Sequence, residues 1–239
     1  MHHLFDDEIS NLERFLDFLS KGHTFISYSE ATNRILRNEV DKPYLVFSSD
    51  DGLESNLTLA KVLSSYNAKA CFFINPASVG LKNPAKIYEF CTKNLKSFTS
   101  RFLDWADIEA IQNQGHEIGS HTMEHINVAE SSLDYFHCDL MESKRVLEAK
   151  CGEINHFAYP FGSKNHFNKE AYEAVFSSGY ESCASAIRGC HTGGVINRDE
   201  LLIKRDHMVF GWPYNHLLYF LNRSIVRSCK QDNLVPSSW

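Results

Sequence analysis

Three short segments of this sequence hold residue types that bind metal ions and transfer protons. The first is the acid pair Asp50-Asp51, followed by Gly52, which two serines separate from the apolar stretch Tyr44 to Phe47. Neighbouring side chains at the end of a strand point to different sides, so one carboxylate can bind a cation while the other stays free to act as a base. Asp-Asp-Gly is also common in solvated turns, and this segment alone decides nothing.

The second segment contains two histidines, His121 and His125, at i and i+4. This spacing predicts a helical turn with both imidazoles on one side, a common way to hold a metal ion. A zinc protease would need glutamate directly after the first histidine, whereas Thr122 occupies that place and Glu124 is out of register. We therefore exclude a zinc protease. Histidines on the surface or at a helix end remain the alternative to ligands.

The third segment, Tyr159-Pro160-Phe161-Gly162, ends an apolar stretch rich in aromatic residues. A loop at this place could present a backbone N–H to an oxygen that becomes negatively charged during a reaction. By itself the same pattern is typical of a structural turn.

The bulk properties indicate a soluble globular protein of 239 residues, 43% of them hydrophobic and 23% charged. The net charge of -6, without a basic run, gives no electrostatic reason to expect a nucleic-acid partner. The first residues, MHHLFDDEISNLERFLDF, lack the basic start and apolar core of a secretory signal, and no segment approaches membrane-spanning length. Seven cysteines occur singly. We therefore expect a reduced, cytoplasmic protein without stable membrane insertion.

Segments of strand length alternate with helical patterns, which favours an α/β fold with a mostly parallel sheet. The predicted strands are residues 44–47, 70–74, 116–119, 155–159, 181–186 and 201–205. The predicted helices are residues 8–21, 55–66, 104–112, 132–150, 169–177 and 214–227, with another helical stretch that ends near residue 37. Residues 80–100 give no assignable pattern. Each of the three chemical segments therefore lies at the end of, or directly after, a predicted strand.

Taken in this order, the three segments resemble the polysaccharide deacetylase family, carbohydrate esterase family four, which includes chitin and peptidoglycan deacetylases. The resemblance covers most of the chain, from the helix around Glu13-Arg14-Phe15 through residues 71–74 and 115–121 to residues 202–205. It implies an irregular (β/α) barrel of about seven parallel strands, with the site at their C-terminal ends. It further implies a single deacetylase domain over residues 1–239, with a helical lead-in at 1–40 and the barrel at 41–228.

The resemblance also implies a role for each motif residue. Asp50 is the general base, Asp51, His121 and His125 hold one divalent metal ion, and Phe161 donates its backbone N–H to the oxyanion. Two imidazoles and one carboxylate leave open positions on the ion for water and a substrate carbonyl. The expected ion is Zn²⁺, with Co²⁺, Ni²⁺ or Mn²⁺ as alternatives.

Two positions depart from the family pattern. Ser49 replaces the aromatic residue before the acid pair, and Ala158 replaces the arginine that orients the base. Because strand ends on one side of a parallel barrel converge, Arg205, at the end of a late strand, is our candidate for the missing arginine. A solvated surface arginine is the alternative.

The general acid is expected to be a histidine from the last motif. His207 follows the apolar strand 201–205 and stands beside Asp206, so we expect it to protonate the departing amine; His216 is the second candidate. Trp105, Trp212 and Tyr214 are candidates for stacking on a sugar ring, although most aromatic residues belong to the core.

The expected reaction is hydrolysis of the N-acetyl group of an amino sugar, carried by a nucleotide or lipid as a precursor of a surface glycan. One alternative is a deformylase or ring-opening amidohydrolase on the same fold, which the changes at Ser49 and Ala158 would allow. Another is a sugar-binding protein without catalysis. The retained Asp50 argues against the latter, because binding alone needs no base beside the ligands.

Overall fold

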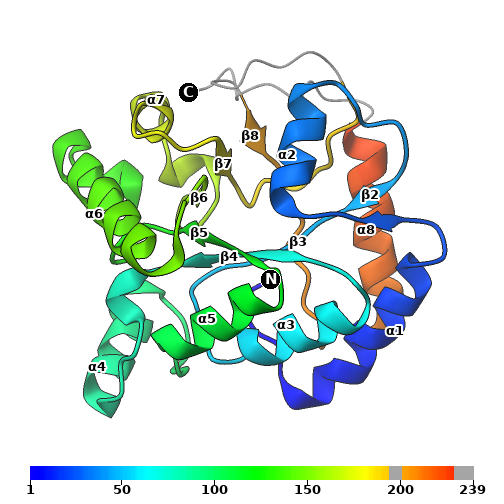
Figure 1. Ribbon diagram of the computed structural model, residues 1–239, viewed down its shortest axis with the longest axis horizontal. Helices are drawn as coiled ribbons and strands as arrows, with labels where there is room; N and C mark the ends of the chain where they lie inside the picture. The colour runs from blue at the N-terminus through cyan, green and yellow to red at the C-terminus, as the bar shows by residue number, and fades with distance from the viewer. Residues whose placement is uncertain (194–200, 229–239) are drawn as a thin grey trace.

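The centre of the fold is a curled sheet of parallel strands, seen in a computed structural model that describes residues 1–193 and 201–228 (Figure 1). The sheet holds its strands in the order of the sequence, and all neighbours are parallel. They are β3 (Phe47–Ser49), β4 (Ala70–Ile74), β5 (Glu117–Ser120), β6 (His156–Ala158), β7 (Ser182–Ala184) and β8 (Leu202–Ile203). Consecutive parallel strands place their C-terminal ends on one edge, where the predicted site residues lie.

A second, two-stranded sheet extends the curl beyond β3. It consists of β1 (Thr24–Phe25) and β2 (Tyr44–Leu45), again parallel. Only Val46 separates β2 from β3, so the two form one interrupted strand. The described residues thus provide seven strand positions, and the predicted irregular barrel of parallel strands is confirmed. The stretch before residue 41 contributes a strand as well as helices.

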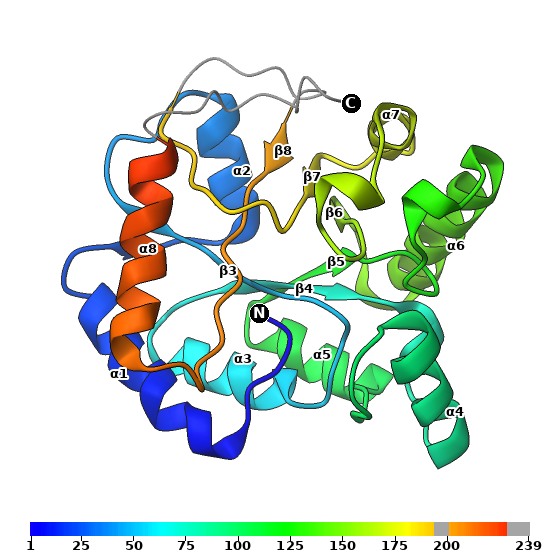
Figure 2. The ribbon, with the colours of Figure 1, turned by 180° about the vertical axis from the view of Figure 1, so that it is seen from behind.

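Most of the helices cover the outside of the curved sheet, whereas α2 packs against the cluster inside the curve (Figures 1 and 2). The helices are α1 (Ile9–Leu19), α2 (Tyr28–Leu36), α3 (Asn56–Ser65), α4 (Pro84–Glu89), α5 (Trp105–Asn113), α6 (Leu133–Cys151), α7 (Lys169–Ser177) and α8 (Tyr214–Ser228). The unassigned residues 80–100 contain α4 and a π-helical turn, η3 (Phe90–Asn94). No helix within the described ranges has the length and apolar character that crossing a membrane requires.

The core has two sides because side chains alternate along each strand. All five residues of β4 are buried. Phe72 packs in the cluster between sheet and helices, whereas Phe73 packs in the smaller cluster inside the curve of the sheet. Ala158 and Ala184 belong to the same inner cluster. These small side chains leave space inside the curve for the longer side chains of the site.

A buried polar network ties α2 to the N-terminal ends of three strands. His156, 2% exposed at the start of β6, lies 2.7 Å from Ser29 Oγ through Nε2 and 2.9 Å from Ser182 Oγ through Nδ1. The Glu117 carboxylate accepts from both the backbone N–H and the hydroxyl of Ser29. Burial, and secondarily the charge of Lys144, lowers the pKa of His156 to about 4.

This buried histidine makes stability depend on pH. The pKa of histidine in an unfolded chain is near 6.5. Between pH 6.5 and 4 the unfolded chain therefore binds a proton that the folded state does not bind, and the free energy of unfolding decreases as the pH is lowered. We expect His156 to destabilise the wild type by about 2 kcal/mol on going from pH 7 to pH 5. Urea denaturation of His156→Gln should show a correspondingly smaller loss over this range. The same change at the exposed His137 on α6 is the control; equal pH slopes for wild type and His156→Gln would contradict the prediction.

Candidate active site

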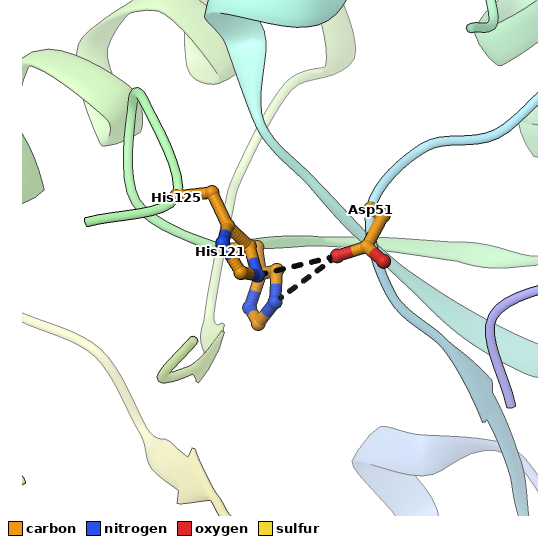
Figure 3. A group of neighbouring side chains, drawn as sticks. All are labelled: Asp51, His121 and His125. Carbon is orange, nitrogen blue, oxygen red and sulfur yellow. Dashed lines mark ion pairs between the residues drawn. The ribbon is translucent and has the colours of Figure 1, made fainter. Parts of the chain in front are cut away.

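Three potential metal ligands meet at the C-terminal ends of β3 and β5. Asp51 follows β3, and His121 begins the loop after β5, which also contains His125. Each histidine places Nε2 3.5 Å from Oδ1 of Asp51 (Figure 3). The three ligand atoms lie within 4.8 Å of one another, and all three residues are buried. The residues predicted as ligands therefore converge on one point.

The loop that carries the histidines is not helical, so the predicted helical turn is wrong. Thr122 has φ 63° and His125 φ 56°, and these left-handed conformations interrupt helical hydrogen bonding. Contacts from other elements hold the loop instead. The Asn75 amide donates to the backbone carbonyls of His121 and Thr122, and Asp139 of α6 accepts from the backbone N–H of Met123 at 2.7 Å. Such backbone strain persists only where the surroundings enforce it.

Backbone carbonyls orient both imidazoles. Nδ1 of His121 donates to the Ala158 carbonyl at 2.6 Å, and Nδ1 of His125 donates to the Asn94 carbonyl at 3.0 Å. With the proton on Nδ1, the lone pair of Nε2 faces Asp51, which is the arrangement that a metal ligand requires.

The donor set fits a divalent ion. Oδ1 of Asp51 is buried and receives no hydrogen bond from the residues that the structure describes. Burial, together with the nearby His121, lowers the pKa of His125 to about 4 and keeps it neutral. Burial also opposes a charge on His121, but its contact with Asp51 and the charge of Asp50, together with the Ala158 carbonyl, outweigh burial and raise its pKa. A cation would replace the proton that Asp51 favours there. Two nitrogens and one carboxylate leave further coordination positions open.

The second carboxylate of the pair, Asp50, forms a buried bidentate ion pair with Arg205. Nη1 of Arg205 lies 2.7 Å from Oδ1 of Asp50, and Nη2 lies 2.9 Å from Oδ2. Arg205 is itself fixed by Ser48 Oγ at 3.1 Å and the Ser185 carbonyl at 2.8 Å. Burial opposes ionisation of Asp50, but the adjacent guanidinium outweighs burial and holds its pKa well below the usual range. Arg205 thus lies beside the candidate base, where the family pattern would place an arginine from position 158.

The two departures from the family pattern have local explanations. Ala158 is fully buried in the inner cluster with Phe73, and the Arg205 guanidinium carbon lies 5.2 Å from the centre of the Phe73 ring. The Arg205 side chain therefore reaches Asp50 from the end of β8, through space that the short side chain of Ala158 leaves free. The Ser49 hydroxyl is also fully buried and donates to Asn56 Oδ1 at 2.8 Å. Its side chain supports the start of α3.

The loop after β6 presents the backbone of Phe161. This residue has φ 63°, and its N–H finds no hydrogen-bond acceptor among the described residues. The next carbonyl, of Gly162, accepts from the Tyr159 hydroxyl and from the Ala186 N–H, both at 2.9 Å. A Cβ at Gly162 would lie 2.4 Å from that of Ala186, so only glycine fits. The Phe161 ring lies 4.7 Å from the His125 ring, which places this loop against the metal ligands.

One residue beside the site, His2, was not singled out in the sequence. Its Nδ1 lies 3.2 Å from Oδ2 of Asp51, and its ring centre lies 5.2 Å from that of His207. The Asp50 N–H donates to the Met1 carbonyl at 3.1 Å, so the first residues run along the end of β3. The adjacent histidines at positions 2 and 3 were the only sequence feature that could have indicated this position. No local pattern connects them to Asp51.

The candidate acids and stacking residues lie in different places. Burial lowers the pKa of His207 to about 4. His207, Asp50 and Arg205 are among the residues that line a cavity of about 610 Å³. His216 is exposed on α8. Of the stacking candidates, Trp212 lies 6.2 Å from His207, whereas Tyr214 packs under Arg14 and Trp105 lies near Lys150.

A carboxylate beside three potential metal donors, with the Phe161 loop packed against one of them, fits a metal-assisted hydrolase. Residues 37–182 match the sequence profile of the family described as Polysaccharide deacetylase. The match spans more than half of the chain. This protein therefore belongs to the polysaccharide deacetylase family, as the sequence motifs predicted. No curated protein sequence matches the chain significantly.

Solved deacetylase structures share the fold. The Streptococcus pyogenes deacetylase PplD in complex with acetate is 16% identical, with a TM-score of 0.69 over 92% of this chain and 93% of its own. IcaB from Ammonifex degensii is 16% identical, with a TM-score of 0.68 over 90% and 87%. The de-N-acetylase from Aggregatibacter actinomycetemcomitans, also 16% identical, gives a TM-score of 0.65 over 89% and 88%. At 16% identity, these similarities show a shared fold and nothing more specific.

The contact between Asp139 and the histidine loop predicts an effect on metal affinity. Asp139→Leu removes the acceptor for the Met123 N–H and should weaken Zn²⁺ binding about 10- to 100-fold, the usual range for residues that support metal ligands. Asp139→Asn keeps an acceptor oxygen and should retain most of the affinity. Isothermal titration with Zn²⁺ measures both, with Asp51→Asn as the variant that loses a ligand. Wild-type affinity in Asp139→Leu would show that the loop holds its shape without α6.

Proposed function

We propose that this protein is a metal-dependent N-deacetylase of an amino sugar. The observation that carries the proposal is the Asp50–Arg205 ion pair beside the three-donor cluster of Asp51, His121 and His125. A site that only binds a metal or a sugar has no use for a second carboxylate held in a fixed orientation. Family membership supports an acylated carbohydrate as the substrate class. We extend the proposal to a precursor of a glycan, carried by a nucleotide or lipid.

The proposed reaction begins with proton transfer to Asp50. A divalent ion, with Zn²⁺ as our first choice, would act as a Lewis acid toward the amide carbonyl and acidify a water molecule. Asp50 accepts a proton from that water as it attacks the amide carbon. Its low pKa keeps the carboxylate ionised at any working pH, and hydrogen bonds from Arg205 to both oxygens fix its orientation. Arg205 is thus a positioning residue for the base.

Phe161 acts on the oxygen of the amide. As water adds to the carbon, negative charge develops on the carbonyl oxygen, and a preorganised N–H donor stabilises that charge more than it stabilises the neutral amide. The left-handed backbone at Phe161 is held by the hydrogen bond from the Tyr159 hydroxyl to the Gly162 carbonyl. The donor keeps its orientation throughout the reaction, so no reorganisation energy is required.

Collapse of the adduct requires an acid that protonates the departing amine. His207 is the candidate from the sequence, but its low pKa leaves it uncharged near neutrality. His2 lies closer to the cluster, in contact with Asp51. The two rings neighbour each other, so both histidines are candidates for the donor.

A release assay tests the function. The Zn²⁺-loaded protein should release acetate from at least one member of a panel of acylated amino sugars and nucleotide sugars. Asp50→Asn should lower turnover about 100-fold or more, and Arg205→Ala should lower it strongly with metal content unchanged. Arg101→Ala is the matched control, because Arg101 forms an exposed ion pair with Glu54. Faster formate than acetate release would indicate a deformylase; bound metal without any turnover would indicate a binding protein.

The pH dependence of turnover distinguishes the two candidate acids. A general acid produces the alkaline limb of the pH–rate profile. Replacing the true donor by glutamine should remove this limb and lower turnover at its optimum, whereas replacing the other histidine should preserve the limb. Because the pKa of His207 is about 4, a limb due to His207 would lie at acidic pH, and we therefore compare kcat from pH 3 to pH 10 for His2→Gln and His207→Gln. A limb that survives in both variants and in the double variant would exclude both histidines.

A further inference from the structure

We propose that the cavity of about 610 Å³ beside Asp50 and Arg205 binds an aliphatic chain that carries an uncharged oxygen. The cavity is called the seam cavity below, because it lies between the first and the last strands of the sheet. This inference goes beyond the proposed function and stands without it, since binding of a chain requires no turnover.

The seam cavity lies where the curled sheet does not close. β3 and β8 are the two edges of the larger sheet, and within the described residues no backbone pairing joins one edge to the other. The ion pair between Asp50 and Arg205 connects these edges. Residues of β2, β3, β8, α2 and α8 line the space around it (Figure 1). The fold thus leaves a space at a place where a closed barrel would have paired strands.

Many side chains around this space are apolar. Ile35 of α2 and Ile203 of β8 are each 8% exposed, and Val46, directly before β3, packs against the same inner cluster. Leu221 of α8 also belongs to the lining. An apolar cavity of about 150 Å³ already takes up benzene in place of water, and ligand pockets generally measure about 300–1,000 Å³. The size and the lining of the seam cavity therefore fit a flexible hydrocarbon chain.

The charges near the cavity favour an uncharged occupant. Ion pairs compensate several charged side chains of the lining: Asp50 with Arg205, Arg34 with Glu30, and Asp206 with Arg188. Lys42 also lines the cavity, but its side chain is exposed to water and lies near the Tyr44 ring. An uncharged molecule leaves these pairs intact, whereas an anionic group would compete with their carboxylates.

His191 supplies a hydrogen-bond donor to the lining. Its Nε2 accepts from the Lys204 N–H at 3.1 Å, so the proton of the neutral ring is on Nδ1. Burial, together with the charge of Lys204, lowers the pKa of His191 to about 4 and keeps the ring neutral. Nδ1 is buried and has no acceptor among the described residues. Because an unpaired buried donor is costly, this N–H fits an ether, ester or amide oxygen of the bound chain.

Two sources of such a chain are compatible with the candidate active site. The chain belongs either to the lipid carrier of a glycan precursor, linked through the anomeric oxygen of the sugar, or to the acyl group that is removed. Asp50 and Arg205 line the same cavity as His191, so a chain from either source passes beside the candidate base. The experiment below therefore has one arm for each source.

Titration with alkyl glucosides tests the seam cavity. Isothermal titration of the Zn²⁺-loaded protein compares glucose with hexyl, octyl and decyl β-glucoside, each below the concentration at which it forms micelles. None of these compounds contains an acyl group that could be hydrolysed. We expect the affinity to rise with chain length, by up to about fourfold for each buried methylene. Decanoate, which carries an anionic group on a similar chain, should bind more weakly than decyl glucoside.

Two kinds of variant locate the binding. Ala31→Phe on α2 and Val40→Phe before β2 each fill part of the cavity, so either should weaken decyl glucoside binding about tenfold and hexyl glucoside binding less. Ala110→Phe, at an exposed site on α5, is the matched control. His191→Phe should weaken binding about fivefold at every chain length, because it removes the donor, and His137→Phe on α6 is its control. Thermal unfolding shows which variants are folded.

The outcomes separate this proposal from the proposed function. Equal affinity for hexyl and decyl glucoside in the wild type would overturn the seam cavity as a chain site, as would chain-dependent binding that the folded filling variants leave unchanged. Tighter binding of decanoate would overturn the choice of an uncharged group. A higher kcat/KM for N-decanoylglucosamine than for N-acetylglucosamine would assign the chain to the acyl group, and the reverse order would assign it to the carrier. If neither acyl group is released while glucoside binding still rises with chain length, only the proposed function fails.

Discussion

The ion pair between Asp50 and Arg205 is the interaction on which the rest of the candidate site depends. Asp50 directly follows β3, and Arg205 lies just after β8, 155 positions later in the chain. Both side chains are nearly buried, 9% and 14% exposed, and losing one partner would leave an uncompensated charge, at a cost of about 3–5 kcal/mol. The curl of the sheet must therefore bring its first and last strands close enough for two hydrogen bonds. The small residues Ala158 and Ala184 inside the curve make this approach possible.

The metal donors depend on the backbone more than on charge. His121 and His125 face Asp51 because carbonyls of Ala158 and Asn94 fix their rings. Thr122 and His125 are left-handed, and the loop is held by contacts from Asn75, directly after β4, from Asp139 of α6 and from the Asn94 carbonyl. The geometry of the candidate ligands thus depends on three segments outside the loop. This division explains how a family can retain its metal motif while the arginine beside the base changes position.

Much of the fold could be predicted from the sequence because local patterns and tertiary structure agree. The predicted bounds of β4 and α7 match the structure at both ends, since a continuous apolar run and a capped amphipathic segment leave little choice. The turn at 121–125 was wrong because its left-handed residues follow from contacts with Asn75 and Asp139, which no local pattern encodes. His2 was missed for a similar reason: its position depends on a backbone hydrogen bond between Asp50 and Met1. Arg205 was a candidate because the convergence of strand ends is a property of the whole barrel.

The separation of Asp50 from Arg205 has a consequence for how activity arises during synthesis of the chain. All three metal donors and the backbone of Phe161 lie within the first 161 residues, whereas the arginine follows β8. A nascent chain can assemble its metal-binding half before the base acquires its partner. Until β8 joins the sheet, Asp50 would have no guanidinium to compensate its burial. Pairing of β8 with β7 therefore also brings the candidate base its charged partner.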